Sequence, residues 1–372
     1  MAAVNLWLDL ESRSGVDIKA RGLDVYSKDP STQITLCAWC INDANPTIWR
    51  PITEQIPEQL QLLLTRREIP KLAFNSQFEQ TMLREVLKID IPTNQFIDVA
   101  TLCRYASIAG SLEFCGKVLG IDEDKAKMAV GRRLIAKFCS PKKGVFRDWV
   151  SDPEDWTLFE QYCCNDVLAE RAIYEKLKAF RLPPQERKIW VLDQEINQRG
   201  IPVDANFVEK ASQIVKSEQD DLMAEFKALT GLENPNSVQQ LLGWLKEQGY
   251  EYGSLGAKWV VKGLAGGVGA AGRRGLELRQ LLAKSSTAKL ETLKNLVGPD
   301  GRLRYQLVYG GAARTLRWSG RGFQPQNLKR STIKDVAGAT EAILSGDREK
   351  VRAFGPPLEV VASCMRGAIR AA

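Results

Sequence analysis

The chain has 372 residues, of which 44% are hydrophobic and 26% carry a charge. Because this is two to three times the ~100–150 residues of a usual domain, we expect at least two packed units. The composition excludes a disordered chain, and no apolar run approaches the ~18 residues of a membrane-spanning helix. The N-terminus has no basic residue ahead of its apolar run, unlike a secretory signal. We therefore expect a cytoplasmic protein without a membrane partner.

Histidine is absent from the sequence. This excludes Ser/His and Cys/His nucleophile pairs, histidine metal sites and histidine general bases. The eight cysteines are scattered through apolar or helical segments, which is typical of reduced, buried thiols. Cys37 and Cys40 have the spacing of half a zinc site, but no second pair follows. Any catalysis must therefore use carboxylates, Tyr, Lys, Cys or a bound metal.

The first half of the chain alternates between β-rich and helical patterns. Alternation of apolar residues predicts strands over 4–11, 33–42 and 46–52, followed by helices over 56–66 and 76–88. This order indicates an α/β sheet domain. Further on, a helix over 153–180 carries one apolar stripe that includes Tyr162, Cys163 and Asp166. An acid therefore lies within an apolar stripe.

Pro183 and Pro184 interrupt the pattern, and long amphipathic helices follow over 185–199, 205–230 and 237–248. We place the first domain at 1–182 and a helical region at 183–299. Within that region the glycine-rich stretch 253–275 is expected to be a loose connection. The last part, 300–372, is expected to hold one more helix over 338–352.

The net charge of +7 is concentrated in one segment. The other residues sum to about zero, so this segment has the charge expected of a polyanion-binding surface. The alternative is an arginine-rich structural loop. The segment covers residues 301–330, contains no acid, and its basic residues are Arg302, Arg304, Arg314, Arg317, Arg321, Lys329 and Arg330.

Asp9 and Glu11 are two residues apart on the first strand, so both carboxylates point to one side of the sheet. Two neighbouring acids on a covered sheet repel each other unless a cation lies between them. The alternative is an edge strand that exposes its acids to water.

Three further acids, Asp166, Glu79 and Asp98, could each have a purely structural role instead of a catalytic one. Tyr162 and Asp166 are four residues apart on one helix face, where Asp166 could instead reach water or pair with Arg171 or Lys176. Ser76 and Glu79 also fit a helix capping box. Asp98 precedes a helix and fits an N-cap.

Taken in order, these motifs resemble the proofreading 3′–5′ exonuclease domain of family A DNA polymerases, which has a DnaQ-like fold with a ribonuclease-H-like mixed sheet. The resemblance implies two Mg²⁺ or Mn²⁺ ions held by Asp9, Glu11, Glu79 and Asp166. It also implies that Tyr162 orients the attacking water. One departure is that the second motif usually ends in Asp, where this chain has Glu79.

The resemblance continues into the polymerase thumb and early palm, through the segments RGIPVD at 199–204 and QNLKR at 326–330. Family members usually have Thr-Gly-Arg where this chain has Thr315, Leu316 and Arg317. The implied partners are a single-stranded DNA 3′ end and a primer-template duplex. The implied DNA-binding residues are Asn75, Arg314, Thr315, Arg317, Arg321, Gln326, Asn327 and Arg330.

In the family, the motif at 366–372 is followed by the polymerase aspartates, which this sequence does not reach. We therefore expect no polymerisation by this chain alone. A second polypeptide with the remaining palm and fingers would cover the apolar run 358–369, which is expected to face water. The phage-type resemblance places the protein in the cytoplasm of a bacterial or phage-infected cell. The alternative function is a non-catalytic DNA-binding or assembly subunit of such a split polymerase.

Overall fold

The computed structural model describes residues 4–121, 125–282, 288–312 and 315–370. The chain divides into two compact units. Unit 1 comprises residues 1–201 and 295–324, and unit 2 comprises 202–294 and 325–372. Among the described residues, no helix is both long and apolar enough to cross a membrane.

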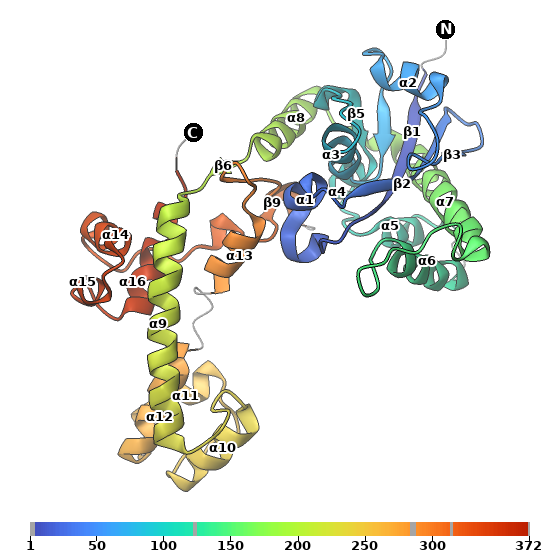
Figure 1. Cartoon of the computed structure of the whole chain (residues 1–372). Coiled ribbons are helices and arrows are strands. Elements are labelled where there is room, and N and C mark those ends of the chain that lie inside the picture. The colour runs from blue at the N-terminus through green and yellow to red at the C-terminus, as the bar shows by residue number, and fades with distance from the viewer. Residues whose placement is uncertain (1–3, 122–124, 283–287, 313–314, 371–372) are drawn as a thin grey trace. The chain divides into compact units, whose positions relative to one another are not determined.

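Unit 1 is built on a five-stranded mixed sheet with the order β3-β2-β1-β4-β5 (Figure 1). β2 is antiparallel to β1 and β3, whereas β4 and β5 run parallel to β1. The α/β mixed sheet and its first three strands are therefore as predicted. The strands are β1 (Leu6–Arg13), β2 (Gln33–Ile41), β3 (Thr47–Trp49), β4 (Lys71–Ala73) and β5 (Phe96–Asp98).

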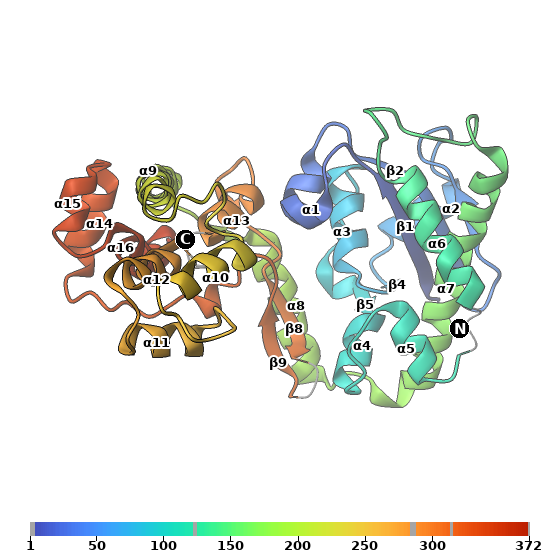
Figure 2. The same ribbon diagram turned by 90° about the horizontal axis from the view of Figure 1, so that it is seen from below.

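Helices cover both faces of this sheet, and Figure 2 shows α1 and α3 on the side opposite α6 and α7. Leu6, Leu8 and Leu10 point into one core, while Trp7 points into the other. The first core is shared with α1 (Ile18–Lys28), α2 (Glu58–Thr65), α3 (Gln77–Glu85) and α8 (Pro184–Arg199). The second is shared with α4 (Val99–Tyr105), α5 (Leu112–Val118), α6 (Lys125–Phe138) and α7 (Pro153–Leu177). Short 3₁₀ turns are η1 (Thr93–Gln95) and η2 (Lys178–Phe180).

A distant part of the sequence completes unit 1. The hairpin of β8 (Leu307–Ala312) and β9 (Arg317–Gly320) packs through β8 on α4 and α8. Part of the last predicted region, residues 300–372, therefore belongs to the same compact unit as the sheet. The remaining elements near this boundary are β6 (Ile201–Pro202), α13 (Ala288–Leu296), β7 (Arg302–Leu303) and η3 (Pro325–Asn327).

Unit 2 is mainly helical, and its longest helix is α9, which contacts α12, α14 and α16. The predicted helices over 205–230 and 237–248 are present. Its helices are α9 (Ala205–Thr230), α10 (Val238–Glu247), α11 (Ala257–Ala265), α12 (Ala270–Leu282), α14 (Val336–Ser345), α15 (Arg348–Arg352) and α16 (Pro357–Cys364), followed by η4 (Met365–Ala368).

The prediction of a loose connection over 253–275 is wrong, because α11 and the start of α12 occupy it. Its glycines permit close helix packing. A Cβ at Gly263 would lie 2.4 Å from Cε2 of Tyr250, and one at Gly275 would lie 2.7 Å from Cζ3 of Trp244. The single helix predicted over 338–352 is also wrong, since Gly346 ends α14 with a φ of 73°.

The expectation that the run 358–369 faces water is wrong as well. Leu358, Val360, Val361 and Met365 are each 1% exposed. α16 packs against α9 and α14 within unit 2, which removes this apolar surface from solvent. The predicted interface with a second polypeptide therefore has no exposed apolar run here.

Candidate active site

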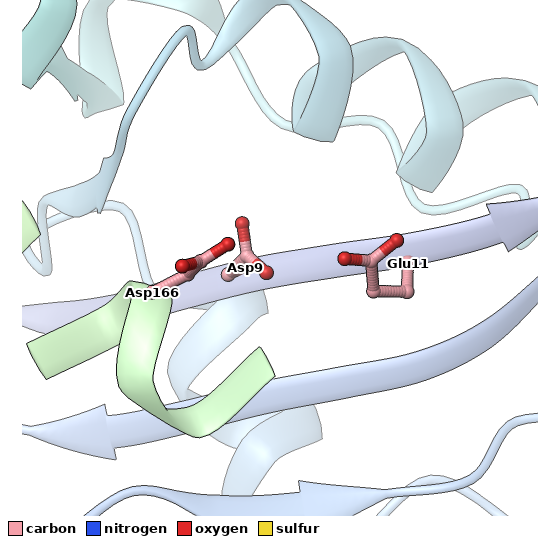
Figure 3. Close-up of side chains that lie close together, drawn as sticks. All are labelled: Asp9, Glu11 and Asp166. Atoms are coloured by element: carbon pink, nitrogen blue, oxygen red, sulfur yellow. The ribbon is translucent and has the colours of Figure 1, made fainter. Parts of the chain in front are cut away.

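Three carboxylates meet above the sheet, and Figure 3 shows Asp9 and Glu11 on β1 with Asp166 on α7. One oxygen from each lies within 4.8 Å of the others. β1 is paired on both sides, with β2 and β4, so the edge-strand alternative does not hold. Arg171 and Lys176 were the alternative partners suggested for Asp166. They donate hydrogen bonds to backbone carbonyls, at 2.7 Å to Ala44 O and 2.8 Å to Leu119 O.

Glu79 approaches the same acids from α3. α3 contacts β1, the strand that carries Asp9 and Glu11. The side chain of Glu79 is 3% exposed, and its Oε2 has no hydrogen-bond partner. Glu79 lies outside the group of three acids whose oxygens are within 4.8 Å.

Of the two helix caps that the sequence suggested, the capping box at Ser76 is absent and the N-cap at Asp98 is present. Ser76 is the N-cap of α3, but its side chain makes no capping hydrogen bond, so the capping box is absent. Asp98 does cap α4, because its Oδ1 accepts hydrogen bonds from the amides of Ala100 and Thr101. Asp98 is therefore engaged structurally, while Glu79 is not accounted for by helix capping.

Burial raises the pKa values of Asp9, Glu11 and Glu79, and the charges of neighbouring acids add to the shift for Glu11 and Glu79. Burial raises the pKa of Asp9 to about 6, although a hydrogen bond from the Cys163 thiol opposes the shift. Burial and the charges of Asp9 and Asp166 raise the pKa of Glu11. The pKa of Glu79 is raised by burial and by Asp9. Bringing these carboxylates together while ionised is therefore costly without a cation.

The donor set fits hard divalent cations. All of the acids offer oxygen ligands, which Mg²⁺ and Mn²⁺ prefer. The unpaired Oε2 of Glu79 is a buried polar atom that a cation would satisfy. Asp9, Glu11, Asp166 and Glu79 are thus the residues that would hold such ions.

Tyr162 lies one helical turn before Asp166 on α7, close enough for the charge of Asp166 to act on its hydroxyl. Burial and the negative charge of Asp166 raise the pKa of the Tyr162 hydroxyl, so it stays protonated. Its ring packs against Gly131 on α6, where an added Cβ would lie 2.4 Å from the ring Cε2. The hydroxyl is therefore kept as a donor beside the acids.

The sequence interpretation did not identify three side chains that contact these motifs. The thiols of Cys163 and Cys139 donate to Asp9 Oδ2 at 3.3 Å and to Glu11 Oε2 at 3.8 Å. Glu170, which is 1% exposed, accepts a hydrogen bond from the amide of Phe74. Helical spacing could have identified Glu170, because it lies four residues after Asp166 on the same stripe.

The basic segment is divided between the two units. Arg317 and Arg321 are exposed at the β8–β9 hairpin of unit 1, whereas Gln326, Asn327 and Arg330 are exposed in unit 2. Thr315 is also exposed and lies in the hairpin turn, and Asn75 is half-buried before α3. Arg314 lies outside the described residues.

Two other basic residues of this segment have structural partners. Arg304 pairs with the buried Asp24 at 3.1 Å, and Arg302 donates to the carbonyl of Gly200 at 3.1 Å. Leu316 has a φ of 53°, which is in the left-handed region that favours glycine. Leu316 thus has a glycine-like backbone conformation at the position where family members usually have the glycine of Thr-Gly-Arg.

No family model matches the chain. The DNA polymerase of Bacillus phage SP02 is 34% identical over 355 residues, which cover 93% of this chain and 54% of the phage protein. A solved structure of the POL domain of Pol1 from M. smegmatis, in complex with DNA primer-template and dNTP, is 16% identical with a TM-score of 0.53. That match covers 89% of this chain and 53% of the other.

The chain therefore spans about half the length of each of these proteins. At 16% identity, the structural match supports the fold. The sequence match relates most of the chain to a phage DNA polymerase.

Proposed function

We propose that the chain is a 3′–5′ exonuclease, the proofreading part of a family A DNA polymerase, and that it hydrolyses 3′-terminal nucleotides of DNA. The observation that carries this proposal is the convergence of Asp9, Glu11 and Asp166 from β1 and α7, with oxygens within 4.8 Å. A mixed sheet covered by helices on both faces agrees with the DnaQ-like resemblance.

The protein residues have distinct roles in this proposal. Asp9, Glu11, Glu79 and Asp166 would hold two divalent ions, which would supply an activated water and stabilise charge on the leaving oxygen. Tyr162 stays protonated close to Asp166, and its hydroxyl would orient the attacking water by a hydrogen bond. The buried surroundings strengthen these electrostatic interactions relative to water.

DNA would be held mainly through its phosphates. Arg317 and Arg321 are exposed at the hairpin of unit 1, where guanidinium groups can neutralise phosphates. Asn75 lies at the start of the motif that ends in Glu79, and we assign it to the single-stranded 3′ end. We assign the remaining predicted contacts, Arg314, Thr315, Gln326, Asn327 and Arg330, to primer-template DNA.

The experiment is single-turnover release of a nucleotide from a 3′-labelled oligonucleotide in Mg²⁺. Asp166→Ala should abolish release while circular dichroism shows a folded protein, because it removes a metal ligand. Glu175→Ala is a matched control, since Glu175 is exposed on the same helix and pairs with Lys178. Full activity of Asp166→Ala would refute the assignment.

A second candidate function is a non-catalytic DNA-binding subunit. The observation in its favour is that Glu79 lies outside the tight group of three acids. The same assay separates the two functions. A wild-type protein that binds the oligonucleotide but releases no nucleotide in Mg²⁺ or Mn²⁺ would support the binding role.

A further inference from the structure

The turn between β4 and α3 is held by two buried carboxylates from different parts of unit 1. Glu170 Oε2 accepts a hydrogen bond from the amide of Phe74 at 2.7 Å. Asp98 Oδ1 accepts one from the amide of Asn75 at 3.0 Å. Two successive backbone amides are therefore bound by acids from α7 and from the N-terminus of α4.

This turn determines where α3 begins. Asn75 has a φ of 70°, a left-handed conformation that asparagine adopts more readily than most residues. The carbonyl of Asn75 then accepts the amide of Phe78 at 3.0 Å. Ser76 contributes no side-chain cap. The first turn of α3, which carries Glu79, therefore depends on the backbone turn for its direction.

The two carboxylates differ in their other contacts. Asp98 is bound by several donors, including the Thr101 hydroxyl at 2.9 Å and the Arg104 guanidinium at 3.3 Å. In contrast, Oε1 of the buried Glu170 has no hydrogen-bond partner. A buried carboxylate with so few partners contributes little net stability, which points to a geometric role.

Glu170 also links two parts of the candidate site. It lies one helical turn after Asp166 on α7, and the amide it binds lies five residues before Glu79. We infer that Glu170 is a positioning residue: by holding the amide of Phe74 to α7, it sets Glu79 relative to Asp166. This inference rests on the proposed function, because it treats Glu79 and Asp166 as ligands of the same metal centre.

Two substitutions at Glu170 distinguish the effect of side-chain length from the effect of charge. Glu170→Gln keeps the side-chain length and a carbonyl oxygen that can accept from Phe74, but removes the carboxylate. Glu170→Asp keeps the carboxylate but withdraws it by one methylene. If Glu170 acts by position, the Asp variant should be impaired and the Gln variant should largely retain function. If it acts through its charge, the order should reverse.

The readouts are hydrogen exchange at the amide of Phe74 and Mn²⁺ binding measured by electron paramagnetic resonance. Glu170→Asp should expose the amide and weaken Mn²⁺ binding by about 10–100-fold, the usual effect of removing a residue that orients a metal ligand. Asp24→Ala removes another buried carboxylate of unit 1 and controls for a general loss of stability. It should leave exchange at Phe74 unchanged.

The outcomes distinguish this inference from the proposed function. Unchanged Phe74 exchange in Glu170→Asp would overturn the inference, as would increased exchange with wild-type Mn²⁺ affinity. Impairment of the Gln variant alone would also overturn it. A wild-type protein that binds no Mn²⁺ would instead overturn the proposed function, and the inference with it.

Discussion

Trp7 and Tyr174 pack edge to face, with ring centroids 5.3 Å apart and planes at 76°. Trp7 lies two residues before Asp9 on the same face of β1, and Tyr174 lies eight residues after Asp166 on α7. This pair therefore helps to hold α7 over the strand that carries the first two acids. Aromatic pairs of this geometry contribute about 0.5–1.5 kcal/mol beyond their buried area.

Tyr174→Ala should lower the free energy of unfolding by about 3 kcal/mol, the usual cost of removing a buried aromatic ring. It should also reduce nuclease activity, because α7 would be held less firmly over β1 near Asp166. Tyr174→Phe keeps the ring and should stay close to wild type. Urea denaturation and the 3′-label assay measure both effects. Wild-type stability of the Ala variant would show that this pair does not hold α7.

Tyr162→Phe removes the hydroxyl but keeps the ring packed against Gly131. We expect single-turnover cleavage to fall by roughly 10–1,000-fold, a range around the usual contribution of a general acid or base, with little change in melting temperature. A normal rate combined with reduced stability would instead assign Tyr162 a structural role.

Gly131→Ala should slow single-turnover cleavage by displacing the Tyr162 ring, since the new Cβ would lie 2.4 Å from Cε2 of Tyr162. In an unobstructed helix this substitution would stabilise by about 1 kcal/mol. A Tyr162→Ala background removes the obstruction, so Gly131→Ala should have no further effect on cleavage there. Equal effects in both backgrounds would contradict the steric explanation.

The stability of the protein should depend on pH and divalent ions together. The pKa of Asp9 is raised from 3.8 to about 6, so the folded protein binds a proton at Asp9 more tightly than the unfolded chain does. Protonation of Asp9 therefore stabilises the folded protein at low pH, and this stabilisation is lost as the pH rises through about 6.

A cation that replaces the proton should stabilise the protein mainly above this range. We expect Mn²⁺ to raise the melting temperature more at about pH 7.5 than at about pH 5, because protons compete with the metal. Asp9→Asn should greatly reduce the shift. Scanning fluorimetry at both pH values tests this, and an equal shift in wild type at both would contradict it.

Replacing Arg317 and Arg321 together should weaken duplex binding similarly for all sequences. Each phosphate that the variant no longer neutralises should change the slope of log affinity against log salt by about 0.9. Lys178→Ala, which removes an exposed cation paired with Glu175, is the control. Fluorescence anisotropy across a salt series measures the slope. An unchanged slope in the double variant would indicate a structural loop.

The sequence predicted the sheet and the position of its acids because period-two alternation on β1 is strong and local. Likewise, the four-residue spacing on α7 predicted that Tyr162 and Asp166 share a face. The same spacing puts Glu170 on the stripe of Asp166, but its hydrogen-bond partner was not predictable, because that partner is a backbone amide 96 residues earlier. Such a hydrogen bond depends on how α7 lies over the sheet.

The errors in unit 2 have a related cause. Glycine is usually a sign of a loop, but Gly263 and Gly275 occur where helices pack against Tyr250 and Trp244. Composition alone does not distinguish these two uses of glycine. The burial of α16 depends on long-range packing against α9, which local patterns do not reveal.

The exonuclease assignment is decided by incubating a 5′-labelled single-stranded oligonucleotide with Mg²⁺ and either wild-type protein or Asp9→Ala. We expect the wild type to produce a ladder shortened one nucleotide at a time from the 3′ end. Asp9→Ala should leave the oligonucleotide intact while remaining folded and able to bind it. Identical ladders from both proteins, or no shortening by the wild type in either Mg²⁺ or Mn²⁺, would contradict the assignment.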